Sequence, residues 1–251
     1  MGRFDHISLV AFDFFGTLAR NDVNEWRRTL AGIAERQGLP VSGGALWDEF
    51  SKHEQQFRKT RTNMADPEAG PPFRTYWEAW REAFATTFDV LELRGDAGDA
   101  ATYSIEMLAD QDAFPDANAM LDAVGRLRET AVLSNADDRF LHGSIAHNGW
   151  RFGCVESSES LQAYKPDPRI FARFADRAGV AANRILYVGD SPYDDAHGAK
   201  LAGMTTILVR RDQNTPGRTP PPDSGGALLA PDYAVESLSE IPGLFREGEA
   251  V

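Results

Sequence analysis

SLVAFDFFGTLAR, residues 8–20, brings an apolar run to its end at a single acid, Asp13, with Gly16 three residues further on. Continuous apolar runs of this length are typical of strands that are buried on both faces of a parallel sheet. In an open parallel sheet, ligands bind at the carboxyl ends of the strands. The stretch therefore predicts a first strand over Ile7–Phe14 whose last residues, the acid included, lie at the binding edge.

The rest of the chain repeats a pattern of short apolar run, turn and helical segment. Further strands are expected at Thr130–Leu133, Cys154–Val155, Ile185–Val188, Thr205–Val209 and Tyr233–Val235. Helices are expected between them, at Asp116–Arg128, Asp137–His147, Pro168–Ala178 and Pro192–Ala202. Strands that alternate with helices predict an α/β fold, here a doubly wound parallel sheet forming a Rossmann-like core.

One segment, residues 19–114, breaks this alternation and shows no convincing strand. Its apolar residues recur at spacings of three and four, as at Trp26, Leu30 and Ile33, which favours helices. We therefore expect a core made of residues 1–18 and 115–251, with residues 19–114 inserted after the first strand as a helical unit. The segment Asp212–Pro231 is rich in proline and glycine and is expected to form a surface loop.

The composition narrows the classes of partner. The chain has 251 residues, and its 26 Lys and Arg against 38 Asp and Glu give a formal net charge of −12, which disfavours nucleic acid and anionic membranes. Cys154 is the only cysteine, so no intrachain disulfide can form. No apolar stretch approaches the roughly 20 residues of a membrane span. We expect a cytoplasmic protein that is a monomer or a homodimer.

Polar side chains follow the expected strands at four places. These are Asp13, Gly16 and Thr17, then Ser134 and Asn135, then Lys165, then Asp190, Asp194 and Asp195. Each group alone is ordinary, since an acid after a strand commonly caps a helix and a lysine is usually solvated. Four such groups at successive strand ends favour a catalytic site instead.

The residue types at these strand ends indicate the chemistry. A carboxylate can attack phosphorus or carbon and form a hydrolysable intermediate, so Asp13 is the candidate nucleophile. Asp13, Asp190 and Asp195 offer the hard oxygen ligands that suit Mg²⁺, which would also relieve the repulsion among them. Lys165 would neutralise Asp13, and Ser134 would hold oxygen atoms of a small anionic substrate.

These motifs resemble those of the haloacid dehalogenase superfamily of hydrolases, and the resemblance extends from Ser8 to about Leu244. The matching runs are DFFGTL at 13–18, SN at 134–135, KPDP at 165–168, GDSPYDD at 189–195 and HGAKLAGM at 197–204. The resemblance implies a mobile helical cap at 19–114 and, for most members, Mg²⁺-dependent hydrolysis of phosphate esters. It implies catalytic roles for Asp13 and Lys165, and substrate contacts for Phe15, Gly16, Thr17, Ser134 and Asn135. It also implies metal ligation by Asp13, the carbonyl group of Phe15, Asp190, and either Asp194 or Asp195, of which the motif spacing favours Asp195.

The chain departs from the phosphatases of that superfamily at Phe15. They carry a second Asp there, which protonates the leaving group and then activates water. Such acid–base assistance is worth roughly 10²–10⁴-fold in rate, and a phenyl ring supplies none of it. Our main hypothesis is a Mg²⁺-dependent phosphatase that uses another acid or base, or a substrate whose leaving group needs little protonation. The intact acids Asp190 and Asp195 support this hypothesis.

Three alternatives stay open. A 2-haloacid dehalogenase needs no acid, because halide leaves without a proton, but the metal-free dehalogenases of the superfamily typically lack the acid found here at Asp190. A phosphonate hydrolase would use a cap lysine, and Lys52 and Lys59 are the only lysines between residues 19 and 114. A catalytically weak protein that binds a phosphorylated ligand would also tolerate Phe15.

Substrate selection is expected to come from arginines of the cap, because arginine can hold a carboxylate or phosphate with two parallel hydrogen bonds. One or two of the six candidates are expected to face the cleft. The candidates are Arg27, Arg28, Arg58, Arg61, Arg74 and Arg81.

Overall fold

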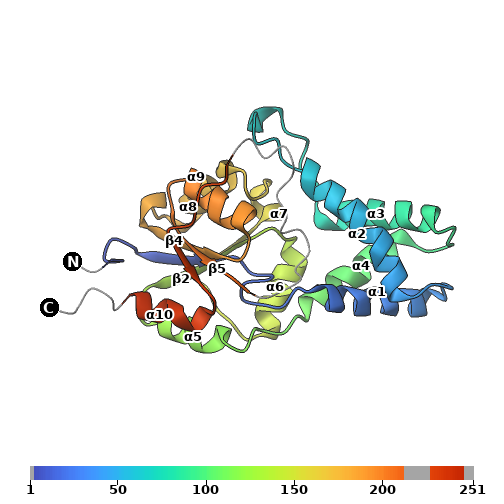
Figure 1. Cartoon of the computed structure of the whole chain (residues 1–251), viewed down its shortest axis with the longest axis horizontal. Coiled ribbons are helices and arrows are strands. Elements are labelled where there is room, and N and C mark those ends of the chain that lie inside the picture. The colour runs from blue at the N-terminus through green and yellow to red at the C-terminus, as the bar shows by residue number, and fades with distance from the viewer. Residues whose placement is uncertain (1–2, 212–226, 246–251) are drawn as a thin grey trace.

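The core of the molecule is one six-stranded, all-parallel sheet. The structure, a computed structural model, describes residues 3–211 and 227–245 (Figure 1). The strand order is β3-β2-β1-β4-β5-β6. The strands are β1 (Leu9–Phe12), β2 (Glu129–Ser134), β3 (Cys154–Ser157), β4 (Ile185–Gly189), β5 (Thr205–Val209) and β6 (Tyr233–Val235). The predicted doubly wound α/β fold is confirmed. The loop expected at Asp212–Pro231 lies, for residues 212–226, outside the described part of the chain.

Helices cover both faces of the sheet, and the side chains of β1, β2, β3 and β4 alternate between two apolar clusters. Val10 and Phe12 of β1 face a cluster that includes residues of α5 (Ala117–Gly125), α6 (Asp138–His147) and α10 (Ile241–Leu244). Leu9 and Ala11 face a second cluster with residues of α7 (Ser158–Leu161), α8 (Pro168–Ala178) and α9 (Gly198–Leu201). The central strands β1 and β4 are therefore buried along their whole length, as a parallel sheet requires.

Four helices stand apart from the sheet between β1 and α5 (Figure 1). They are α1 (Val23–Gln37), α2 (Gly43–Thr60), α3 (Tyr76–Val90) and α4 (Ala97–Ala109), and we call them the helical insertion. Besides these four helices, residues 19–114 contain a short 3₁₀ turn at Pro67–Ala69 and isolated β-bridges at Ala19, and they contain no strand. No helix in the described residues is long and apolar enough to cross a membrane.

The chain enters and leaves the helical insertion through two adjacent segments. The N–H of Phe114 donates to the carbonyl of Leu18 at 2.9 Å, and the N–H of Arg20 donates to the carbonyl of Asp112 at 3.0 Å. This arrangement is what an insertion after the first strand requires. The division into a core of residues 1–18 and 115–251 and a cap of residues 19–114 stays a prediction.

The segment after β4 differs from the expected helix at Pro192–Ala202. It begins as a π-helical turn, η3 (Pro192–His197), and only then continues as α9. The carbonyl of Ser191 accepts from the N–H of Ala196, five residues on, and the Ser191 hydroxyl accepts from the N–H of Asp194. Single π turns of this kind are frequent at functional sites. This one directs Asp195 toward the carboxyl end of the neighbouring strand.

Candidate active site

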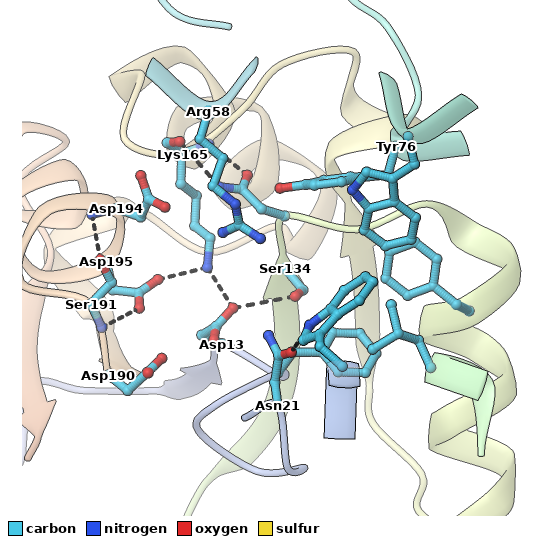
Figure 2. A pocket seen from close by; sticks show the side chains of 16 residues that line it. Asp13, Asn21, Arg58, Tyr76, Ser134, Lys165, Asp190, Ser191, Asp194 and Asp195 are labelled. Atoms are coloured by element: carbon cyan, nitrogen blue, oxygen red, sulfur yellow. Dashed lines mark hydrogen bonds and ion pairs between the residues drawn. The ribbon is translucent and has the colours of Figure 1, made fainter. Parts of the chain in front are cut away.

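The site centres on Asp13, which follows β1 and is only 6% exposed. Three side chains donate hydrogen bonds to its carboxylate, and Figure 2 shows the two from Lys165 and Ser134. Lys165 Nζ and Ser134 Oγ lie 2.6 and 3.2 Å from Oδ1, and Thr17 Oγ1 lies 3.3 Å from Oδ2. The structure thus brings four of the predicted site residues together, from strand ends far apart in the sequence.

Lys165 lies between two carboxylates. Its Nζ is 2.6 Å from Asp13 Oδ1 and 2.6 Å from Asp195 Oδ1 (Figure 2). Burial alone would lower the pKa of Lys165, but the charges of Asp13 and Asp195 outweigh burial and raise this pKa well above its ordinary value. Asn135 fixes the backbone of Lys165 from both sides, since its Oδ1 accepts from the Lys165 N–H at 2.8 Å and its Nδ2 donates to the Lys165 carbonyl at 3.1 Å. Lys165 is therefore a permanently charged, fixed cation.

Tyr187, a residue that the sequence did not single out, also holds this lysine. It is fully buried inside β4, and its hydroxyl accepts from Lys165 Nζ at 2.9 Å and donates to the carbonyl of Leu133 at 2.7 Å. In the sequence, Tyr187 is one more apolar position of a strand. Its distinguishing feature, a hydroxyl that reaches Lys165, depends on the pairing of strands that are distant in the chain.

Three buried carboxylates form a group that could hold a metal ion. One oxygen each from Asp13, Asp190 and Asp195 lies within 4.8 Å of the others. Burial raises the pKa of Asp13, and the charge of Asp190 raises it further, while Lys165 opposes both. Burial likewise raises the pKa of Asp195 to about 6. The donor set fits a hard divalent cation such as Mg²⁺, because it consists of oxygens and one ammonium leaves the group with excess negative charge.

Gly16 is required by the close approach of Asp190. Its φ of +93° is a left-handed conformation, and a Cβ atom at this position would lie 2.7 Å from Asp190 Oδ2. A larger residue would be strained and would clash with the carboxylate. Thr17 completes this contact, since its Oγ1 donates to Asp190 Oδ1 at 3.1 Å as well as to Asp13. The DFFGTL run thus packs directly against the acid after β4.

Two neighbouring acids after β4 point to different partners. Asp195 joins Lys165 in the site, whereas Asp194 accepts from Arg61 Nη2 at 2.9 Å. The Arg61 side chain, which is 2% exposed, also donates to the hydroxyl of Tyr76 at 2.5 Å and to the carbonyl of Lys165 at 3.3 Å. Asp195, not Asp194, belongs to the carboxylate group, as the motif spacing favours, and Asp194 connects the core to the helical insertion.

Aromatic side chains form the wall of the pocket opposite the acids. Phe15 lies in this wall with its ring centroid 4.9 Å from that of Phe14 and 5.4 Å from that of Phe140. The insertion contributes Trp26 and Trp80. The pocket therefore has a charged side, at the strand ends, and an apolar side. Among the described residues that line the pocket, the acids are Asp13, Asp190, Asp194 and Asp195, and all four belong to the charged side.

Of the six candidate arginines, Arg58 is the one that lines the pocket, and its guanidinium group points into it (Figure 2). The Arg58 side chain is 19% exposed, and Nε pairs with Glu54 one helical turn away. The other candidates are engaged elsewhere: Arg27 with Asp48, Arg28 with Glu25, Arg61 with Asp194, Arg74 with Glu82, and Arg81 over the ring of Trp77. Lys52 pairs with Glu49, and neither Lys52 nor Lys59 is among the pocket residues.

Comparison with known proteins gives one family. Residues 7–203 match the family model described as hydrolase, haloacid dehalogenase-like hydrolase. The chain is 29% identical to (S)-2-haloacid dehalogenase 4A of Burkholderia cepacia, over 94% of each chain. It is 26% identical to (S)-2-haloacid dehalogenase 1 of Pseudomonas sp. (strain CBS-3), over 96% of this chain and 97% of that protein.

A solved structure is similar to this chain in both fold and sequence. The L-2-haloacid dehalogenase of Xanthobacter autotrophicus superposes with a TM-score of 0.72 at 25% identity. The superposition covers 97% of this chain and 100% of the dehalogenase chain. The likeness therefore includes the helical insertion as well as the sheet.

Proposed function

The chain belongs to the haloacid dehalogenase-like hydrolase family, and we propose that within this family it displaces halide from a small 2-halo carboxylic acid, with Asp13 as the nucleophile. The observation that carries this proposal is the pair of Asp13 and Phe15 in one pocket: a held carboxylate faces an aromatic wall that has no acid. A leaving group in such a pocket must depart without a proton, and halide does. The curated relatives named above, similar over nearly their whole length, favour the same chemistry.

The proposed reaction has two steps. An oxygen of Asp13 attacks the carbon that bears the halogen, a C–O ester bond forms, and the carbon–halogen bond breaks with its electron pair leaving as halide. Water then attacks the carbonyl carbon of the Asp13 ester, which restores the carboxylate and releases a 2-hydroxy acid and a proton. Lys165 and Ser134 hold the carboxylate in place through the hydrogen bonds to Oδ1.

Arg58 is the proposed partner of the substrate carboxylate. Lys165 is committed to Asp13 and Asp195, so it cannot serve a second anion. The Nε atom of Arg58 donates a hydrogen bond to Glu54, and the terminal nitrogens of Arg58 have no hydrogen-bond partner among the described residues. A guanidinium group with two free terminal nitrogens suits a carboxylate geometrically.

A second candidate, metal-assisted hydrolysis of a phosphate ester, is favoured by one observation: Asp13, Asp190 and Asp195 converge within 4.8 Å. These residues would hold a Mg²⁺ ion, and the ion would neutralise the acids and polarise a phosphoryl oxygen. In this case Asp13 would again be the nucleophile, and Ser134 and Arg58 would bind the phosphoryl and its second anionic group. The ligand role of the Phe15 carbonyl stays a prediction.

One substrate panel separates the two candidates. The purified protein is incubated with 2-chloropropionate, phosphonoacetaldehyde and a set of small phosphate esters, each with EDTA and with Mg²⁺. We expect halide release from 2-chloropropionate that EDTA leaves unchanged. Turnover of phosphate esters alone, and only with Mg²⁺, would replace the proposal by the second candidate. No turnover under any condition would favour a ligand-binding role.

A further inference from the structure

Asp137 connects the loop after β2 to a helix of the insertion. It lies three residues after Ser134, at the start of α6, and is 4% exposed. Its side chain makes no capping bond to α6. Instead Oδ1 accepts from the N–H of Tyr76 at 2.6 Å and Oδ2 accepts from the N–H of Trp77 at 2.8 Å, the first two residues of α3. A residue of the core thus caps a helix of the insertion.

The two N–H groups that donate to Asp137 have no hydrogen-bond acceptor within α3 itself. Thr75, the N-cap residue of α3, and Glu78 form a capping box, in which the Thr75 hydroxyl accepts from the N–H of Glu78. The N–H groups of Tyr76 and Trp77 have no intrahelical acceptor, as is general for a first turn. Without Asp137 these buried donors would be left unpaired, which is costly. The start of α3 is therefore fixed to the core at one carboxylate.

Helix α3 carries part of the pocket wall. Tyr76 and Trp80 both line the pocket that contains Asp13. Their rings are 5.3 Å apart, and the ring of Trp80 stacks at 5.8 Å on that of Phe140, which belongs to α6. The hydroxyl of Tyr76 accepts from Arg61. The register of α3 against the core therefore sets where these two rings stand relative to the nucleophile.

Asp137 is held in this place without a cation. Among the described residues no ion pair includes it, and the charged groups facing it are acids, Asp138 and Glu159. Glu159 is itself occupied, because its Oε2 accepts from the N–H of Asp138 at 2.7 Å. Burial raises the pKa of Asp137 to about 6, so an ionised carboxylate is buried here at neutral pH at a cost in stability. A cost of this kind is expected where a residue serves the site and not the fold alone.

We propose that Asp137 is a positioning residue, which holds the first turn of α3 and with it Tyr76 and Trp80 over Asp13. For its effect on turnover the inference rests on the hydrolysis proposed above. The contact itself can be tested without any substrate. Asp137 does not touch the reacting atoms, so its substitution should act through the pocket wall.

Three variants test this role. Asp137→Ala removes both acceptors, and Asp137→Asn keeps one acceptor oxygen in the same shape. Asp96→Ala is the matched control, because the Asp96 side chain caps α4 of the insertion by accepting from the N–H groups of Gly98 and Asp99, and within residues 3–211 and 227–245 it has no hydrogen bond to the core. Amide hydrogen exchange is measured over residues 75–80, and kcat and KM are measured with whichever substrate the panel identifies.

The expected result has two parts. Exchange over residues 75–80 rises at least tenfold in Asp137→Ala, rises less in Asp137→Asn, and stays unchanged in Asp96→Ala. kcat/KM falls at least tenfold in Asp137→Ala, recovers partly in Asp137→Asn, and stays within twofold in Asp96→Ala. Unchanged exchange at the start of α3 would overturn the inference whether or not a substrate is found. An equal loss of kcat/KM in Asp137→Ala and Asp96→Ala would overturn it as well, because it would show a general effect of stability.

Discussion

Asp13 is buried beside Lys165, whose positive charge stabilises the ionised carboxylate. Burial and Asp190 raise its pKa, which disfavours the ionised form that a nucleophile needs, and Lys165 acts in the opposite direction. Asp195 shares the same ammonium group. Under the proposed chemistry, the residue that fits least well is Asp190, because its carboxylate lines the pocket in which an anionic substrate would bind.

Asp190→Asn distinguishes the two candidate reactions by the sign of its effect. If the substrate is a 2-halo acid, removing a like charge a few Å from the substrate carboxylate should lower KM by about threefold or more. If a metal ion is needed, the same substitution should abolish turnover. Steady-state kinetics with 2-chloropropionate decides between them, and a higher KM for this substrate would contradict dehalogenation.

Arg58→Met should weaken substrate binding more than it slows the chemical step. Because Arg58 would pair with the non-reacting carboxylate of the substrate, we expect KM to rise at least about tenfold while kcat changes less. Arg28→Met is the control: Arg28 lies on the surface of α1 and is 68% exposed. If both variants behave like the wild type, another group recognises the carboxylate.

At the scale of elements, helix ends carry the contacts between sheet and insertion. Arg61 follows the last residue of α2 and reaches Asp194 and the Lys165 carbonyl, and Asp137 holds the first turn of α3. The apolar spacing predicted the helices themselves, and the expected bounds of α8, β5 and β6 agree with the structure. The apolar spacing could not predict these end contacts, because they join residues 60 or more positions apart that no local pattern links.

The burial of Asp137 should make stability depend on pH, because burial raises the pKa of this carboxyl group more than the hydrogen bonds from the N–H groups of Tyr76 and Trp77 lower it. The pKa of Asp137 in the folded protein, about 6, lies above its ordinary value, so the folded state binds the proton more tightly. Its contribution to stability is greatest below pH 4 and is lost as pH rises through about 6. Relative to Asp137→Asn, which does not titrate there, the wild type should lose up to about 3 kcal/mol of unfolding free energy between pH 4 and pH 7.5. Urea unfolding at both pH values measures this difference, and a constant difference would contradict the raised pKa of this buried carboxyl group.

At the scale of the whole molecule, the strand order explains why the site could be anticipated from the sequence. β1 lies between β2 and β4, so the residues after these three strands meet at one edge, and Asp13, Ser134 and Asp190 follow from the apolar runs that precede them. Lys165 was placed there by its motif. What the pattern could not give was the other half of the pocket. The aromatic wall and Tyr187 depend on how the insertion and distant strands pack, and only this packing selects Arg58 from the six candidate arginines. The motif spacing favoured Asp195 over Asp194, and the structure shows that the two carboxylates have different partners, Lys165 and Arg61.

The most direct test is a single turnover in H₂¹⁸O. The protein, in excess over 2-chloropropionate and without added metal, is allowed to react once. The masses of the product and of the peptide of residues 8–20 are then measured by mass spectrometry. If Asp13 forms the ester and water attacks its carbonyl carbon, chloride is released, the hydroxy acid carries no ¹⁸O, and Asp13 gains one ¹⁸O atom. Labelled hydroxy acid with an unlabelled Asp13, or no chloride release at all, would contradict nucleophilic attack by Asp13 on a carbon–halogen bond.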